Sequence, residues 1–135
     1  MGEWKIGEME VMPFISCNIT LHNHTGNDMF VNDFGLSHGE WHDGVLPDAA
    51  VGDRARSQWQ SDSRGTATGT EGFIDYRLGG GPAGPGPTVI HVHWDVPFIG
   101  SNSMDVNVPD SIQAQFTNNS GNNVDNSITL LPKDE

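Results

Sequence analysis

The chain has 135 residues and a formal net charge of −12, from 6 Lys and Arg against 18 Asp and Glu. So few basic residues exclude a nucleic-acid-binding protein, because that binding depends on Lys and Arg neutralising phosphates. The 17 Gly and 8 Pro exclude long helices. The length suits one domain, residues 1–135.

Alternation of apolar and polar residues predicts short β-strands along most of the chain. In chain order, strands are expected at 15–21, 29–34, 72–78, 88–96, 104–108, 112–116 and around 128–130. Turns are expected at 23–27 and 118–123, and residues 79–87 form a loop of Gly and Pro with one Ala. Residues 38–60 show little alternation, so we interpret them as a loop excursion or a short strand.

Six to eight short strands separated by frequent turn signals favour an antiparallel β-sandwich or barrel. We predict an all-β, single-domain antiparallel β-sandwich. Its core should contain the residues on the apolar side of each alternating segment. These are Ile15, Cys17, Ile19, Leu21, Ile90, Val92, Trp94, Val106 and Phe116.

Six histidines raise the question of a metal site. His91 and His93 share one face of a strand, and Asp95 continues that face, so these three side chains could ligate one metal ion. No histidine follows His93, so the further downstream histidine that such a metal site usually includes is absent. We expect polar, partly exposed side chains on a solvent-facing strand, and no cofactor; a metal-binding protein using His91 and His93 is the second alternative.

Catalytic patterns are weak in this sequence. Cys17, the single cysteine, lies on the apolar side of a strand, where a small buried hydrophobic residue is expected. Because no nucleophile is paired with a base and a third orienting group, we expect no enzymatic activity.

Two of the four tryptophans occupy irregular, polar sequence. Trp94 lies within a periodic apolar segment typical of a core, whereas Trp41 and Trp59 do not. Such aromatic residues either cap the core from loops or contact a ligand, namely a sugar ring or a membrane interface.

The first fourteen residues carry acidic side chains where a secretory signal carries basic ones, and no apolar stretch reaches 18 residues. We therefore expect a soluble protein made in the cytoplasm, which would reach target membranes without a secretory signal.

Three segments, in order and at similar spacing, resemble the aegerolysin family. Residues 91–102 (HVHWDVPFIGSN) resemble its Trp-Asp-x-Pro-Trp-Gly-Ser segment. Residues 61–75 (SDSRGTATGTEGFID) resemble its Gly-Arg-Ser-Asp stretch and the Gly-Thr-x-Gly-x-Phe-Asp-Leu that follows. Residues 34–44 (FGLSHGEWHDG) resemble its Leu-x-Trp-Gly-Lys-x-x-x-Asp-Gly element. The Gly/Pro segment 79–87 has no counterpart in the family pattern.

The resemblance implies a small acidic β-sandwich that binds particular membrane lipids. In the family these are sphingomyelin with cholesterol, or ceramide phosphoethanolamine. Some members recruit a larger perforin-like partner that forms the pore, and some act as hemolysins, cytolysins or insecticidal toxins. The implied partners are therefore a sphingolipid- or sterol-containing membrane and a pore-forming protein.

The predicted lipid-binding site combines the loop aromatic residues with these segments. Trp41, Trp59 and Phe98 would form or border the contact surface, with Trp94 as a buried support. Asp95 and Arg64 are predicted to form a headgroup pocket, and His38 is the last member of the site. A sugar-binding, lectin-like β-sandwich is the first alternative, because aromatic faces also stack on pyranose rings.

Overall fold

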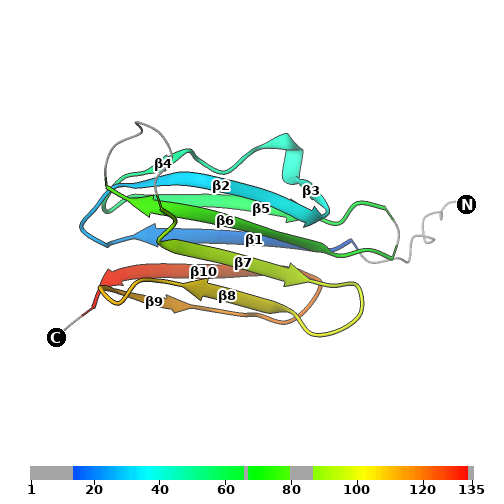
Figure 1. Ribbon diagram of the computed structural model, residues 1–135. Helices are drawn as coiled ribbons and strands as arrows, with labels where there is room; N and C mark the ends of the chain where they lie inside the picture. The colour runs from blue at the N-terminus through cyan, green and yellow to red at the C-terminus, as the bar shows by residue number, and fades with distance from the viewer. Residues whose placement is uncertain (1–13, 66, 80–86, 134–135) are drawn as a thin grey trace, which may run out of the picture.

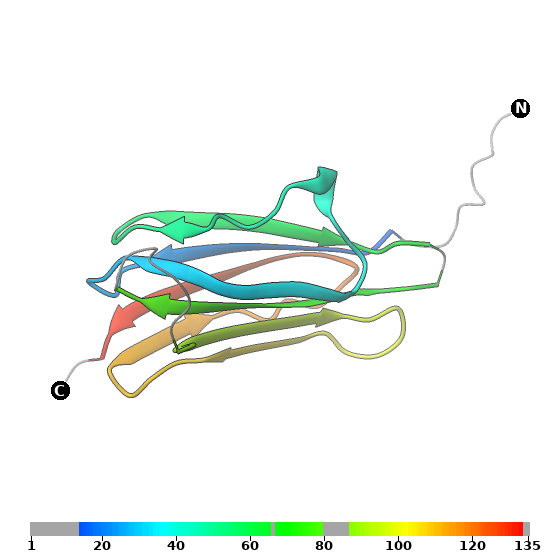
Figure 2. The ribbon, with the colours of Figure 1, turned by 45° about the horizontal axis from the view of Figure 1, so that its top comes forward.

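The computed structural model describes residues 14–65, 67–79 and 87–133. Within them the chain forms two β-sheets packed face to face (Figure 1). Figure 2 shows the same two layers from a second direction. The predicted fold class, an all-β antiparallel sandwich, is confirmed, with one parallel strand pair as an exception.

Each sheet has five strands. In chain order the strands are β1 Ser16–Asn23, β2 Met29–His38, β3 Glu40–Trp41, β4 Ala50–Val51, β5 Arg56–Asp62, β6 Thr70–Leu78, β7 Ile90–Val96, β8 Ser103–Asn107, β9 Ile112–Phe116 and β10 Asn123–Pro132. One sheet has the order β3-β5-β1-β10-β9 and the other the order β4-β2-β6-β7-β8. A short 3-10 turn, His42–Gly44, follows β3. No helix in the described part of the chain is long and apolar enough to cross a membrane.

The parallel pair joins β1 and β10 in the middle of one sheet. Its register runs from Ser16 opposite Asn123 to Asn23 opposite Leu130. A parallel pair needs a long crossover, and here that crossover contains all the other strands. All other strand pairs of the described residues are antiparallel, so the sandwich is antiparallel apart from this pair.

The core lies between the two sheets and is built from alternate residues of each strand. Seven predicted core residues are confirmed as buried: Ile15, Cys17, Ile19, Leu21, Ile90, Val92 and Trp94. Val106 is half-buried and packs against this cluster. The prediction for Phe116 is wrong, because its side chain is 42% exposed. Phe116 is the last residue of the edge strand β9, where no further strand covers it.

Strand β5 lies in the segment interpreted as irregular. Its inward side carries Ser57, Trp59 and Ser61, all buried, while Arg56 and Gln58 are exposed. The alternation has a period of two, but two of its three buried positions are serine, so hydrophobicity does not reveal it. Trp59 therefore lies in a strand and not in a loop, and Trp41 ends the short strand β3. Trp4 and most of the Gly/Pro loop lie outside the described residues.

Candidate functional site

Three connections meet at one end of the sandwich, on the right in Figure 1. We call this the loop end and define it as residues 63–65, 67–69, 97–102 and 117–122. They connect β5 to β6, β7 to β8 and β9 to β10. Pro97 ends β7, since proline cannot donate to the sheet ladder. The resemblance segments 61–75 and 91–102 therefore come together here.

The loop end carries almost no charge, although the whole chain carries −12. Its described residues include no Asp, Glu or Lys, and Arg64 is their one basic residue. The carboxylates begin at the strand ends behind it, with Asp62 and Asp95. An anionic surface would therefore meet less electrostatic repulsion at this end than elsewhere on the described part of the molecule.

The tip of the loop end is apolar. Phe98 is half-buried and packs against the core cluster, whereas Ile99 beside it is 83% exposed. The backbone behind the tip is held closely by Gly69. A Cβ atom at position 69 would lie 2.3 Å from the carbonyl oxygen of Val96 and 2.7 Å from Cα of Pro97. Only glycine permits this approach, so the backbone at position 69 packs directly against the backbone that leads into the tip.

An acidic cavity of about 330 Å³ lies on one side of the tip. It is lined by His38, Ala67, Thr68, Gly69, Thr70, Glu71, Asp95, Pro97 and Phe98. Glu71 accepts a hydrogen bond from Nε2 of His93 at 2.8 Å and lies 3.9 Å from Nε2 of His38. Burial raises the pKa of the Asp95 carboxyl above its usual range, and the charge of Glu71 acts in the same direction.

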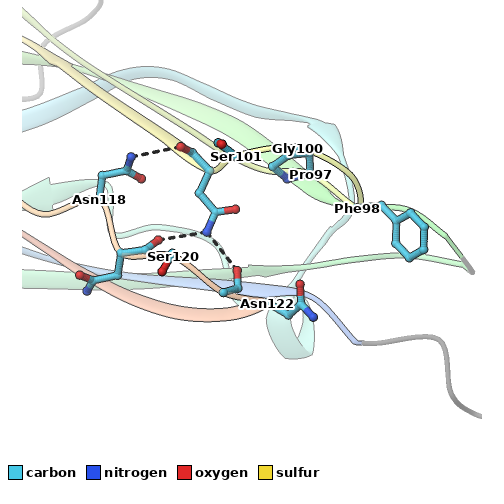
Figure 3. A pocket seen from close by; sticks show the side chains of 10 residues that line it. Pro97, Phe98, Gly100, Ser101, Asn118, Ser120 and Asn122 are labelled. Atoms are coloured by element: carbon cyan, nitrogen blue, oxygen red, sulfur yellow. Dashed lines mark hydrogen bonds between the residues drawn. The ribbon is translucent and has the colours of Figure 1, made fainter.

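A second, larger depression lies on the other side of the tip, between the connections 97–102 and 117–122. We call it the amide groove. It has a volume of about 460 Å³ and contains no charged residue. It is lined by Pro97, Phe98, Gly100, Ser101, Asn102, Asn118, Asn119, Ser120, Gly121 and Asn122. Figure 3 shows Asn118 and Ser120 on one wall, Ser101 and Gly100 on the other, and Phe98 at the outer end.

The structure brings together three of the seven predicted site residues. His38, Asp95 and Phe98 line the acidic cavity. Arg64 does not line it, but the Arg64 carbonyl accepts a hydrogen bond from Oγ1 of Thr68, which does, at 2.7 Å.

The three tryptophans of the predicted site pack on one another inside the sandwich. The ring centroids of Trp41 and Trp94 lie 6.1 Å apart, and those of Trp59 and Trp94 lie 5.8 Å apart. Trp94 is fully buried, as predicted, and its Nε1 donates to Oγ of Ser61 at 2.9 Å. Trp59 is only 3% exposed, and it lines a separate depression of about 230 Å³ beside His42 and Gln58. Trp41 is half-buried.

The histidine pairs contact carboxylates individually. His91 is hydrogen-bonded to Asp75, and His93 contacts Glu71 through Nε2 and Asp105 through Nδ1, at 2.8 Å and 3.5 Å. These contacts use opposite sides of the His93 ring and do not converge. Among the described residues, no group of three His, Cys, Asp or Glu side chains is placed to hold a metal ion.

The sequence interpretation missed Ile99, Glu71 and the amide groove. Ile99 was visible as an apolar residue in a connection, directly after Phe98. The run Asn118 to Asn123 indicated a turn, but nothing in the sequence indicated that it would face residues 97–102. Cys17 is buried as expected, and burial raises the pKa of its thiol to about 12, so the thiol stays protonated at neutral pH.

Comparison with known proteins gives a likeness of fold. No protein-family model and no curated protein matches the sequence. Among solved structures, the crystal structure of the lipid binding protein Nakanori superposes with a TM-score of 0.73. The match covers 92% of this chain and 74% of the other, at 12% identity. At that identity the likeness establishes a shared architecture.

Proposed function

We propose that the protein binds membrane lipids through the loop end. The observation that carries the proposal is Ile99, an 83% exposed apolar side chain at the tip of an end without carboxylates. Full burial of such a side chain is worth about 1.5–3 kcal/mol. Nakanori, whose architecture the chain shares, is itself named a lipid binding protein.

Insertion would be shallow in this proposal. Ile99 and the edge of Phe98 would enter the interface, while the acidic body, with its −12 charge, stays in water. The attachment would be apolar, with little Coulomb attraction, so raised salt should not weaken it. The acidic cavity beside Phe98 would take part of the headgroup, with Asp95 and His38 in its wall.

The lipid and the partner follow from the sequence resemblance. We propose a sphingolipid- or sterol-containing membrane as the target and a larger perforin-like protein as the partner that forms a pore. The protein itself would catalyse no reaction in this scheme. It would recognise the membrane and mark it for the partner.

Vesicle sedimentation tests the membrane contact. Ile99→Asp should weaken binding to sphingomyelin–cholesterol vesicles by about tenfold or more, because it removes apolar burial and adds a charge at the interface. Val45→Asp is the matched control, since Val45 is also exposed, at 63%, but follows the 3-10 turn and not the loop end. Equal binding by Ile99→Asp and the parent protein would refute the proposal, as would equal loss in both variants.

Two further arms test the finer proposals. Replacing sphingomyelin–cholesterol by phosphatidylcholine alone should abolish sedimentation if a sphingolipid or sterol is the target. Release of a trapped dye by this protein alone would contradict the role of a pore-forming partner.

A further inference from the structure

We infer that the amide groove binds a neutral hydroxylated ring of the hexopyranose type, presented either by a glycolipid headgroup or by a free glycan. The groove shares Phe98 with the apolar tip, but its chemistry is the recognition of hydroxyl groups and not membrane insertion. It therefore goes beyond the proposed lipid contact and does not depend on it.

The floor of the groove is already fixed by hydrogen bonds between its two walls. Nδ2 of Asn102 donates to the carbonyl oxygens of Asn119 and Gly121, at 3.0 Å each. Nδ2 of Asn118 donates back to the carbonyl oxygen of Asn102 at 3.1 Å. The dashed lines in Figure 3 mark these bonds, which connect residues 97–102 to residues 117–122.

One wall is further anchored to β10. The backbone N–H of Asn119 donates to Oδ1 of Asn126 at 2.9 Å, and Nδ2 of Asn119 donates to the carbonyl oxygen of Asp125 at 2.6 Å. Asn126 is buried. Because these hydrogen bonds hold the two walls of the groove to each other and to β10, few groups need to be ordered when a ligand enters, and that reduces the cost of binding.

Several polar groups of the groove remain available to a ligand. Within the described part of the chain, the side chains of Ser101, Ser120 and Asn122 make no hydrogen bond, and Oδ1 of Asn102 and Oδ1 of Asn118 accept none. Hydroxyl and amide groups of this kind both donate and accept. Sugar hydroxyls have the same dual character, so the two sets of groups are complementary.

The absence of charge in the groove discriminates between ligand classes. A phosphate or carboxylate would need a cationic or helix-terminal partner, and no Lys or Arg lines the groove. A quaternary ammonium would need several aromatic faces or a carboxylate, and the groove offers the single ring of Phe98. That ring and Pro97 instead supply a short apolar surface on which the C–H face of one sugar ring can lie. The volume of about 460 Å³ falls in the usual range of small-molecule sites, about 300–1,000 Å³.

The test compares a groove variant with a matched surface variant. Ser120→Ala/Asn122→Ala removes polar groups without breaking any side-chain hydrogen bond of the described structure. Gln113→Ala/Gln115→Ala is the control, since both glutamines are exposed on β9, outside the groove. Thermal unfolding of all three proteins establishes that each is folded before binding is compared.

Binding is measured in two arms. Calorimetric titration with methyl hexopyranosides and neutral oligosaccharides tests free glycans. Sedimentation with phosphatidylcholine vesicles, with and without monohexosylceramide, tests a glycolipid. We expect binding in at least one arm and a loss of about tenfold in the groove variant, with no loss in the glutamine variant.

The outcomes separate this inference from the membrane proposal. Binding of free glycans identifies a soluble source, whereas binding to vesicles only when monohexosylceramide is present identifies a membrane source. No binding in either arm, or equal binding by the groove variant and the parent, overturns the inference. Neither result bears on Ile99→Asp, which tests vesicles that contain no sugar.

Discussion

A buried hydrogen bond between the two sheets offers a direct test of the core. Oγ of Ser61, on β5, accepts from Nε1 of Trp94, on β7, at 2.9 Å and from Oγ1 of Thr70, on β6, at 2.7 Å. Ser61→Ala leaves the indole N–H of Trp94 without an acceptor inside the core. The hydroxyl of Thr70 keeps an acceptor in this variant, because its Oγ1 also donates to the carbonyl oxygen of His38 at 3.3 Å.

The expected cost is that of one unsatisfied buried donor, about 1–3 kcal/mol of unfolding free energy. For a chain of this length about 1 kcal/mol corresponds to roughly 4 °C, so Tm should fall by about 4–12 °C. Urea unfolding followed by tryptophan fluorescence measures the change. Ser127→Ala is the control, since Ser127 is exposed on β10 and should change stability by less than about 0.5 kcal/mol.

A double-mutant cycle identifies the source of the cost. Phenylalanine at position 94 has no N–H, so Ser61→Ala should cost clearly less in a Trp94→Phe background than in the parent protein. The same loss in both backgrounds, or a loss below about 0.5 kcal/mol in the parent, would show that this hydrogen bond does not stabilise the packing of the two sheets.

Three other variants test the surroundings of the loop end. Nδ1 of His42 donates to Oδ2 of Asp62 at 2.6 Å, and this hydrogen bond raises the pKa of His42 above its usual 6.5. The stability that the charged imidazole contributes should therefore be lost as pH rises through the raised pKa. His42→Gln should flatten the decline of Tm as pH rises above about 6.5, and an unchanged slope would contradict this. Burial raises the pKa of the Asp95 carboxyl above 3.8, so the charged form of Asp95 disfavours folding at neutral pH. Asp95→Asn should therefore raise Tm at about pH 7, and this gain should shrink as pH falls toward 3.8. A lower Tm in the variant at about pH 7 would contradict this. Gly69→Ala places a Cβ against the carbonyl oxygen of Val96, so both Tm and vesicle binding should fall, and unchanged values would show that the tip is not held by this contact.

Strand positions were predictable where apolar residues alternate with polar ones over a long segment. In β1 and β7, burial alternates along the strand as the sequence indicates. The sequence did not distinguish strand β5 from a loop, because the inward positions on either side of Trp59 are small and polar; Ser57 and Ser61 are as buried as Trp59. Phe116 has the right periodicity, but local pattern does not reveal that its strand lies at a sheet edge.

The site was predictable only in its local parts. His38, Asp95 and Phe98 reach one cavity because two of them flank the end of β7 and the third ends β2, two strands away in the same sheet. The amide groove depends on residues 117–122 facing residues 97–102, which belong to connections of different sheets. That arrangement follows from how the two sheets stack, which periodicity along a single strand cannot indicate.

The parallel pairing of β1 with β10 also constrains when the protein can fold during synthesis. The side chains of Asn18 and Asp125, hydrogen-bonded across this pair, are separated by 107 residues. A nascent chain can pair β6, β7 and β8 as they emerge, since these strands are consecutive and adjacent. Strand β1 keeps an open edge until β10 leaves the ribosome, and an open edge can pair with other chains. Folding should therefore be slow, about milliseconds to seconds, and the waiting interval is the period in which the chain depends most on chaperones.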